Sequence, residues 1–403
     1  MRLSFIVHPP RMQAVIAPPS PGIVIGRQLR VAYAIDSLAD SGGTELHAVR
    51  LAEHMARNGT NVSLITLNAD GPMRPRYAAA GIDVHAFPVR SLVGISAVRQ
   101  LQAMAALFRE KRFDVVHAHD CYTNFLVTIA GRVAGVPLVV ASKRWTKHLY
   151  PQHAWTNRLA FRAAHLVVAN SPAVAETVHR DEWVSRPRIH VTPNFLEPSS
   201  FEVPSIDSRR AVRASLGYSD EHVVFAILAR LRVEKDHPML LRAFERVVRD
   251  HPNARLLIIG DGPERARIEQ QIASASLDQV VHLSGHVAKP RPLLAAVDVC
   301  VLTSRHEGSP NALMEGMAQG RPVVGTAAGG VVDAVHDHDT GLLSPVGDHD
   351  KLADNMIRIL ADETLRRRLG TAARADMIAR FGASTAIQNL LSLYCARLPD
   401  HRR

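Results

Sequence analysis

Short apolar runs alternate with amphipathic segments along most of the chain. The first run, LRVAYAID, is followed by a segment that places Leu46, Val49, Ala52 and Met55 on one face of a helix. Apolar runs without polar alternation are typical of strands that are buried on both faces, and the helices between them supply the cover. The pattern therefore predicts a parallel sheet with helices on both sides.

The same alternation continues on both sides of one interruption. Residues 195–210, FLEPSSFEVPSIDSRR, are rich in proline and serine and are expected to form a linker. Further strands are predicted at NVSLITL, GIDVHAFPV, FDVVHAH, VPLVVAS, HLVVANS and RIHVTPN before it, and at HVVFAILARL, ARLLIIGDGP, VVHLSGHV, VDVCVLTS and PVVGT after it. We therefore expect an α/β protein with two doubly wound, Rossmann-like domains that face a central cleft.

The chain is long enough for two domains, since a single hydrophobic core rarely grows beyond about 250–300 residues. We expect residues 1–28, which are cut by several prolines, to be a flexible leader. Residues 29–205 should form the N-terminal domain and residues 206–380 the C-terminal domain. Residues 381–403 should be a helix that packs back toward the N-terminal domain.

Composition narrows the class of partner. The hydrophobic fraction is 47%, and no apolar run reaches the length of a membrane-spanning helix. The net charge of +10 favours phosphorylated ligands or an anionic membrane surface. We expect no nucleic acid partner, because the arginines are scattered and no known nucleic-acid module is present. Three widely spaced cysteines suit a reducing compartment, so we expect a cytoplasmic protein.

Ligands of doubly wound sheets bind beyond the carboxyl ends of the strands, so residues at these ends are the first candidates for a functional site. After the strand VDVCVLTS, the sequence Ser309-Pro310 predicts the start of a helix. Its free N–H groups would bind an anion such as a diphosphate. The residues that would carry these groups are Asn311, Ala312 and Leu313.

Two acids flank this anion site, Glu307 before the helix and Glu315 within it. Acids are poor partners for phosphate alone, but they accept hydrogen bonds from sugar hydroxyls, which predicts a nucleotide-sugar ligand. Arg230 and Lys235 follow another strand, where they could clamp a diphosphate or simply belong to a surface charge cluster.

Candidates in the first half are weaker. Gly42 and Gly43 would let backbone approach a phosphate, or they form only a turn. His119 ends a strand at the cleft, whereas His117 lies within that strand and is interpreted as structural. IIGDGP is interpreted as a plain turn. The two triplets Asp337-His338-Asp339 and Asp348-His349-Asp350 are interpreted as surface turns rather than metal sites.

The span from about 29 to 395 resembles the retaining glycosyltransferases of family 4, which have two facing Rossmann-like domains of the GT-B type. The resemblance rests on SGGTELHAVRLAEHMARNG, FDVVHAHD, VVANSPAV, VTPN, ARLRVEKDHPMLLRAF, IIGDGPER, LSGHV and SRHEGSPNALMEGMAQGRPVVGTAAGG. The last segment, with seven residues between its two acids, is the most specific.

The resemblance implies a role for each candidate. It implies that the N-terminal domain faces the acceptor and that the C-terminal domain binds the nucleotide-sugar. It assigns Glu307 to the donor sugar, Glu315 to the ribose and His119 to the neighbourhood of the transferred sugar. The diphosphate would contact Arg230 and Lys235, and the donor site would also include Gly42, Gly43, Val287, Gly308, Asn311, Ala312 and Leu313.

This chain also departs from the family pattern. Asp333 stands where the family often has Glu, and Asn194-Phe195 replaces a common Asn-Gly. The segment ASKRWTKHLY replaces a frequent Thr-x-His sequence, so the acceptor cannot be taken from other members. We expect its residues Lys143, Arg144, Trp145, Lys147 and His148 to lie at the rim of the cleft.

The resemblance implies an enzyme that transfers a sugar from a nucleoside-diphosphate sugar to an acceptor hydroxyl with retention of configuration. It implies no cofactor and no metal, because the cations and the helix start supply the positive field. We expect a saccharide or lipid-linked saccharide acceptor of surface polysaccharide or glycolipid synthesis, with the inner face of the cytoplasmic membrane as a candidate surface. A soluble enzyme with a small acceptor, a nucleotide-sugar epimerase and a non-catalytic binding protein are alternatives.

Overall fold

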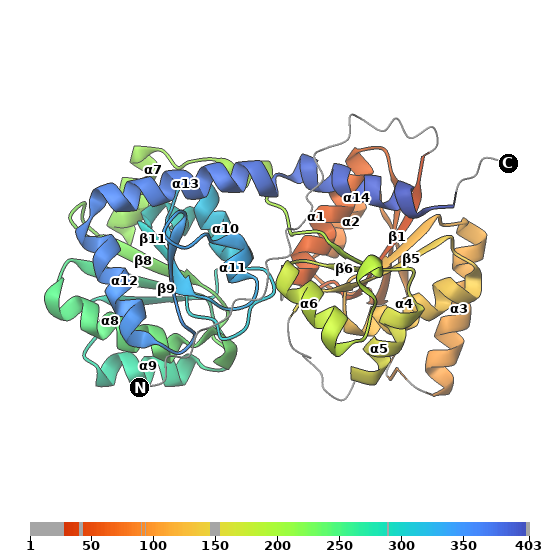
Figure 1. Ribbon diagram of the computed structural model, residues 1–403, viewed down its shortest axis with the longest axis horizontal. Coiled ribbons are helices and arrows are strands. Elements are labelled where there is room, and N and C mark those ends of the chain that lie inside the picture. Colours follow the sequence, from red (N-terminus) through yellow and green to blue (C-terminus); the bar gives the residue numbers. More distant parts are fainter. Residues whose placement is uncertain are drawn as a thin grey trace, which may run out of the picture.

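The computed structural model describes residues 28–39, 43–89, 91–92, 94–145, 154–287 and 290–399. They form two α/β domains that lie side by side (Figure 1). The proposed leader up to residue 27 and the candidates Gly42, Lys147 and His148 lie outside the described residues. No helix in the described parts of the chain is long and apolar enough to cross a membrane.

The N-terminal domain contains a seven-stranded parallel sheet in the order β3-β2-β1-β4-β5-β6-β7. Its strands are β1 (Arg30–Ser37), β2 (Asn61–Asn68), β3 (Asp83–Ala86), β4 (Val115–Ala118), β5 (Leu138–Lys143), β6 (Leu166–Ala169) and β7 (Ile189–Val191). Its helices are α1 (Gly43–Arg57), α2 (Arg74–Ala79), α3 (Ile95–Lys111), α4 (Cys121–Ala134), α5 (Ala154–Ala163) and α6 (Pro172–Asp181).

The C-terminal domain contains a six-stranded parallel sheet in the order β10-β9-β8-β11-β12-β13. Its strands are β8 (Val223–Leu228), β9 (Ala254–Ile259), β10 (Val281–Gly285), β11 (Val299–Leu302), β12 (Val323–Thr326) and β13 (Gly341–Ser344). The helices of this half are α7 (Ile206–Ser215), α8 (His237–Asp250), α9 (Arg265–Ser274), α10 (Asn311–Ala318), α11 (Val331–Ala334), α12 (His349–Ala361) and α13 (Glu363–Phe381), and α14 (Ala383–Arg397) follows.

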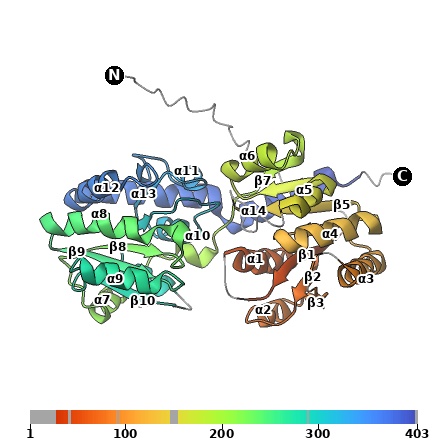
Figure 2. The same cartoon turned by 90° about the horizontal axis from the view of Figure 1, so that it is seen from below.

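Helices cover both sides of each sheet (Figure 2), which explains the continuous apolar strands. In β1, the residues from Val31 to Ile35 are each at most 1% exposed. The predicted α/β fold class, with two doubly wound domains, is therefore confirmed. In each sheet the strand order reverses between two central neighbours, β1 and β4 in one and β8 and β11 in the other. Ligands of such sheets bind at this reversal.

The last two helices connect the domains. Helix α13 lies along the C-terminal domain, and α14 continues across to the N-terminal domain (Figure 1). There Ile387, Leu390 and Tyr394 enter the same hydrophobic core as residues of α1 and β1. The backbone N–H of Leu196 donates to the carbonyl of Phe381 at 2.7 Å. The segment that leads into the C-terminal domain and the segment that leads back out of it therefore lie side by side.

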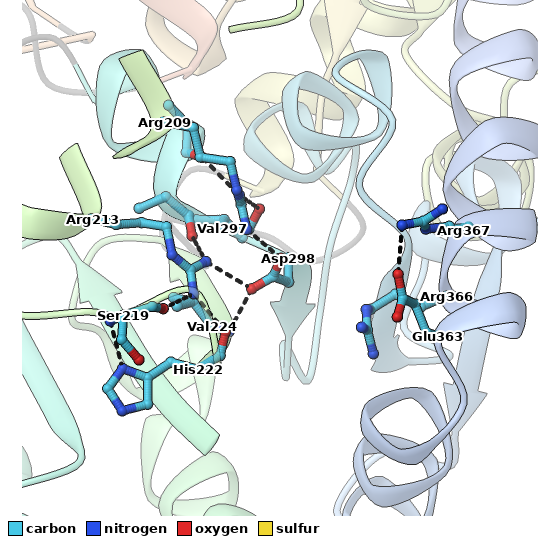
Figure 3. A network of polar contacts seen from close by, with 12 residues as sticks. Arg209, Arg213, Ser219, His222, Val224, Val297, Asp298, Glu363, Arg366 and Arg367 are labelled. Carbon is cyan, nitrogen blue, oxygen red and sulfur yellow. Dashed lines mark hydrogen bonds and ion pairs between the residues drawn. The ribbon is translucent and has the colours of Figure 1, made fainter. Parts of the chain in front are cut away.

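A buried arginine fastens α7 to the second sheet (Figure 3). The Arg213 side chain is only 2% exposed, and it donates to Oδ2 of Asp298 at 3.1 Å and to the carbonyl of His222 at 2.5 Å. Asp298 also accepts from Arg209 at 2.6 Å and from the backbone N–H of Val224 at 2.8 Å. One carboxylate thus ties α7 to β8 and to the start of β11.

Replacing this carboxylate should destabilise the protein. Asp298→Ala leaves the Arg213 guanidinium buried without its counter-ion, which typically costs about 3–5 kcal/mol of unfolding free energy. Urea denaturation measures the loss. The matched control is Glu363→Ala, because its partner Arg367 is 80% exposed and such pairs contribute less than about 1 kcal/mol (Figure 3). Equal losses in the two variants would contradict the role assigned to Asp298.

Candidate active site

Helix starts from the two domains face each other. Helix α10 begins at Asn311 and helix α1 begins at Gly43. A Cβ atom added to Gly43 would lie 3.0 Å from Nδ2 of Asn311, so the two starts are in direct apposition. The free N–H groups and the dipole at a helix start attract anions. An anion bound at this place would contact both domains.

The start of α10 differs from the prediction. Pro310, and not Ser309, takes the N-cap position, and no side chain caps the helix. The N–H of Asn311 donates to the carbonyl of Ser309 at 3.0 Å, so the first N–H of the helix is already hydrogen-bonded and does not serve an anion. The N–H groups of Ala312 and Leu313 have no partner within the helix and remain the candidate anion ligands.

The structure brings Lys235 and Glu307 together. Nζ of Lys235 lies 2.6 Å from Oε2 of Glu307, and both side chains are largely buried, with exposures of 22% and 13%. The Ser304 hydroxyl lies 3.3 Å from the same carboxylate oxygen. Two residues that the sequence placed on separate strand ends thus form one charged pair at the carboxyl edge of the second sheet.

A second ion pair holds the two loops that carry Lys235 and Glu307. Nε of Arg305 donates to Oδ2 of Asp236 at 2.7 Å, and the Thr303 hydroxyl donates to the carbonyl of Lys235 at 2.8 Å. Asp236 has a φ of 48°, a left-handed conformation that aspartate tolerates better than most residues. These supporting residues were not found from the sequence, because no local signal pairs Asp236 with Arg305.

The IIGDGP segment forms a turn, as interpreted from the sequence, and this turn packs closely against the end of β8. Gly260 has a φ of 148°, and a Cβ atom there would collide with the carbonyl of Ala229. The N–H of Leu231 donates to the carbonyl of Asp261 at 3.0 Å. The glycine turn therefore braces the end of β8, where the exposed Arg230 lies.

Glu315 contacts the other domain. Oε1 of Glu315 lies 3.5 Å from Nη1 of Arg50 on α1. Nε of Arg50 is also 3.9 Å from Oε1 of Glu197, and the other carboxylate oxygen of Glu197 accepts from Nε2 of His54 at 3.0 Å. Arg50 was not singled out from the sequence, because only the contact between domains reveals its partner.

His119 is fully buried at the end of β4, on the N-terminal domain. Neither of its ring nitrogens has a hydrogen-bond partner among the described residues. Burial, with His117 and Arg144 nearby, holds its pKa well below the usual range, so the ring is neutral at pH 7. It lies next to a small cavity that is also lined by His47, His117, Arg144, Thr192 and Phe195, among others.

His117 is part of a buried hydrogen-bond chain, as the interpretation of a structural histidine implies. Its Nδ1 lies 2.6 Å from the Tyr394 hydroxyl of α14, and its Nε2 lies 2.6 Å from the Ser142 hydroxyl. Its ring stacks on His119 with 4.3 Å between centroids. Burial lowers the pKa of His117 to about 3. The chain places a neutral imidazole directly against His119.

Two acids that were not predicted from the sequence meet at the reversal point of the first sheet. The backbone N–H of Asp36, in β1, donates to Oδ2 of Asp120 at 2.6 Å. Asp120 also caps α4 by accepting from the N–H and the hydroxyl of Thr123. Burial and the neighbouring Asp36 raise the pKa of Asp120 to about 8. The buried carboxyl group of Asp120, next to His119, therefore holds a proton more readily than an ordinary aspartate does.

Lys143 does not lie at the rim of the cleft, which corrects that prediction. Strand β5 extends to Lys143, which pairs in register with Ala169 of β6, so Lys143 belongs to the sheet and not to the loop after it. Its Nζ is 2.7 Å from Oε1 of Glu182, and the two residues are 3% and 0% exposed. Trp145 is partly buried. Lys143 is therefore not part of the basic rim that was predicted for ASKRWTKHLY.

Arg144 links the domains instead of facing solvent. Its Nη1 donates to Oδ1 of Asn194 at 2.7 Å, and Nδ2 of Asn194 donates to Oδ1 of Asn311 at 2.7 Å. Burial lowers the pKa of Arg144 to about 10. Phe195, next to Asn194, packs its ring against His47 at 5.2 Å. The Asn-Phe departure thus joins the start of α10 to the core of the N-terminal domain.

Gly308 lies where the backbones of the two domains touch. A Cβ atom on Gly308 would collide with the carbonyl of Arg144. Behind it, a Cβ atom on Gly330 would collide with the carbonyl of Gly308. Oδ2 of Asp333 accepts from the N–H of Ala173 at 3.3 Å, which adds a further contact between domains. Only glycine fits at the centre of this contact.

The remaining candidates lie elsewhere in the C-terminal domain. Val287 follows β10 and packs partly buried on its core. Asp337 accepts from the N–H of Leu343, and Asp348 caps α12 through the N–H of Lys351. Both triplets thus contain a turn or cap residue. Within the described residues, no group of three or more His, Cys, Asp or Glu is arranged to bind a metal ion.

Solved structures show the same fold. The structure of Alr3699/HepE from Anabaena with UDP and glucose has a TM-score of 0.80 and 22% sequence identity, covering 92% of this chain and all of that one. A glycosyltransferase from Rickettsia africae has a TM-score of 0.83 and 17% identity, over 93% of this chain and 99% of that one. At these identities the likeness concerns the fold.

Sequence comparison gives the family. The chain is 30% identical to the lipopolysaccharide core biosynthesis glycosyltransferase LpsE of Rhizobium meliloti over 59% of this chain and 66% of that protein. One family model, glycosyl transferases group 1, matches residues 208–376, and another, glycosyl transferase 4-like domain, matches residues 42–194. Together the two models span both domains, and the chain belongs to the group 1 glycosyltransferases.

Proposed function

We propose that this glycosyltransferase binds a nucleoside-diphosphate sugar between the opposed starts of α1 and α10. The proposal rests on the ion pair between Lys235 and Glu307, in which Nζ and Oε2 are 2.6 Å apart. Glu307 comes shortly before the start of α10 in the chain. A cation, an acid and free helix N–H groups suit a ligand that combines phosphates with sugar hydroxyls. The structure of Alr3699/HepE contains UDP, which makes UDP-sugars the first donors to test.

In this proposal the chain stabilises charge and positions the substrates. The N–H groups of Ala312 and Leu313, with Lys235 and Arg230, hold the diphosphate as it leaves. Glu307 accepts from hydroxyls of the donor sugar, and His119 lies near the transferred sugar. The departing diphosphate takes the proton of the acceptor hydroxyl on the same face, so the anomeric configuration is retained.

Glu315 changes partner in this proposal. It lies 3.5 Å from Arg50 in the structure, yet it is the residue proposed to accept from the ribose hydroxyls. Donor binding therefore competes with an ion pair between the domains. The domain contact and the nucleotide site are then coupled through one carboxylate.

For the acceptor, we propose a lipid-linked saccharide at a membrane surface. One relative acts in lipopolysaccharide core biosynthesis. The UDP-Gal:alpha-D-GlcNAc-diphosphoundecaprenol alpha-1,3-galactosyltransferase of Escherichia coli is 24% identical over 77% of this chain and 84% of that protein. The net charge of +10 suits an anionic leaflet. These features favour a peripheral enzyme over one with a small soluble acceptor.

Removing the charge of Glu307 should abolish most transfer. Glu307→Gln keeps the size of the side chain but loses the acceptor strength, and loss of one such group costs about a hundredfold or more in turnover. Lys235→Ala should lower kcat/KM at least about tenfold, because a charge-assisted contact is lost. Sugar transfer from UDP-sugars measures both. The control is Glu234→Gln, because the half-exposed Glu234 pairs with Arg232 and not with Lys235. Normal turnover of Glu307→Gln would refute the assignment.

The two variants that break the Arg50–Glu315 pair should change the affinity for UDP in opposite directions, depending on which residue is replaced. Arg50→Gln frees Glu315 and should tighten UDP binding by about fivefold or more, because donor binding no longer has to break an ion pair worth about 1 kcal/mol or more. Glu315→Gln should weaken it. Calorimetric titration with UDP measures both changes. Arg57→Gln, on the same helix, is the control, and weaker UDP binding by Arg50→Gln would argue against competition.

Transfer should not require a metal ion. Arg230, Lys235 and the start of α10 supply the positive charge that a divalent cation would otherwise bring. We expect the same transfer rate with and without an excess of chelator. An enzyme that loses activity in chelator and regains it only with added divalent metal would disprove the metal-free mechanism.

A further inference from the structure

The two tryptophans that are most exposed among the described residues lie together on the N-terminal domain. Trp155 and Leu159 are one turn apart on α5, and they are 50% and 48% exposed. Trp183, after α6, is 64% exposed. The guanidinium of Arg158 on α5 lies 4.7 Å from the centre of its ring, so Trp183 is adjacent to α5. With the exposed Arg162, these residues form what we call the α5 face.

The chain around the α5 face is positively charged. Residues 121–175 contain no Asp or Glu, but they include Arg132, Arg158 and Arg162. The nearest acids belong to the end of α6 and beyond, and they are already paired. Asp181 lies 2.7 Å from Nε of Arg180, and the buried Glu182 lies 2.7 Å from Nζ of Lys143 and 3.7 Å from Nε of Arg158. One buried acid thus serves both Lys143 and Arg158, so the α5 face combines exposed aromatic rings with a net positive charge.

The α5 face lies at the same end of the sheet as His119. Nδ2 of Asn157 on α5 donates to Sγ of Cys121, the first residue of α4, at 2.8 Å. The Trp155 ring contacts the Phe125 ring on α4, with 6.0 Å between centroids. Because α4 begins directly after His119 and Asp120, the first turns of α5 lie beside the part of the domain proposed to face the acceptor.

We propose that the α5 face seats the protein on anionic lipid headgroups, an inference that rests on the proposed lipid-linked acceptor. Tryptophan rings prefer the membrane–water interface, and arginines are attracted to anionic lipid. Lys143 and Arg144, which the sequence suggested for this role, are engaged inside the protein. A second copy of the chain fits the face less well, because a two-fold contact would bring arginine against arginine.

The experiment compares cosedimentation with vesicles of phosphatidylcholine alone and with added phosphatidylglycerol. Wild type should bind only the anionic vesicles, and more weakly in high salt. Trp155→Ala/Trp183→Ala and Arg162→Gln should each lower binding about fivefold or more. The controls are Ile206→Ser and Arg367→Gln, which alter similarly exposed residues of the other domain and should bind as wild type does.

The outcomes separate this inference from the proposed function. Hydrolysis of UDP-sugar in the absence of lipid should be unchanged in the α5 variants, and its absence from wild type would count against the proposed donor. Vesicle binding that the variants leave intact would overturn the α5 face but not the membrane proposal. No vesicle binding at any salt would overturn both. A wild-type dimer on size-exclusion chromatography that Trp155→Ala/Trp183→Ala converts to a monomer would instead assign the face to a second copy.

Discussion

The two domains touch at backbone distance, and this close approach depends on a glycine. No side chain fits at Gly308, because its Cβ would collide with the carbonyl of Arg144. With the two backbones in contact, Asn194 can reach Asn311, Arg50 can reach Glu315, and Asp333 can reach the start of α6. The start of α10 is thereby held opposite the start of α1. The geometry of the anion site therefore follows from one steric condition in the β11–α10 loop.

Charge in the cleft is balanced within the protein. Lys235 is paired with Glu307 and Arg50 with Glu315, while the buried His117 and His119 are held neutral by desolvation. Such a site does not leave isolated charges buried, which would be costly. A ligand that carries both phosphates and hydroxyls can replace each partner with another of the same character. This balance favours a nucleotide-sugar over a simple anion.

Basic residues divide into two groups with different physical roles. Arg213 and Lys143 are buried and Arg144 is half-buried, and each makes polar contacts that fasten elements or domains together. Arg158 and Arg162 lie on a helix surface beside exposed tryptophans. The net charge of +10 does not distinguish these groups, because it counts a buried structural cation and an exposed one equally.

The sequence by itself determined the fold class and the identity of the donor-site candidates. Buried parallel strands must be apolar throughout, and helix starts and strand ends have local signatures, so Glu307, Lys235 and the α10 region could be found. Tertiary structure alone decided the partners. Arg50 with Glu315, Asp36 with Asp120 and Arg305 with Asp236 come from separate elements, and no local pattern pairs them. The same reason explains why Lys143 was wrongly predicted to lie at the rim of the cleft. A lysine near the end of a strand is expected to be exposed, and only the fold brings Glu182 against it.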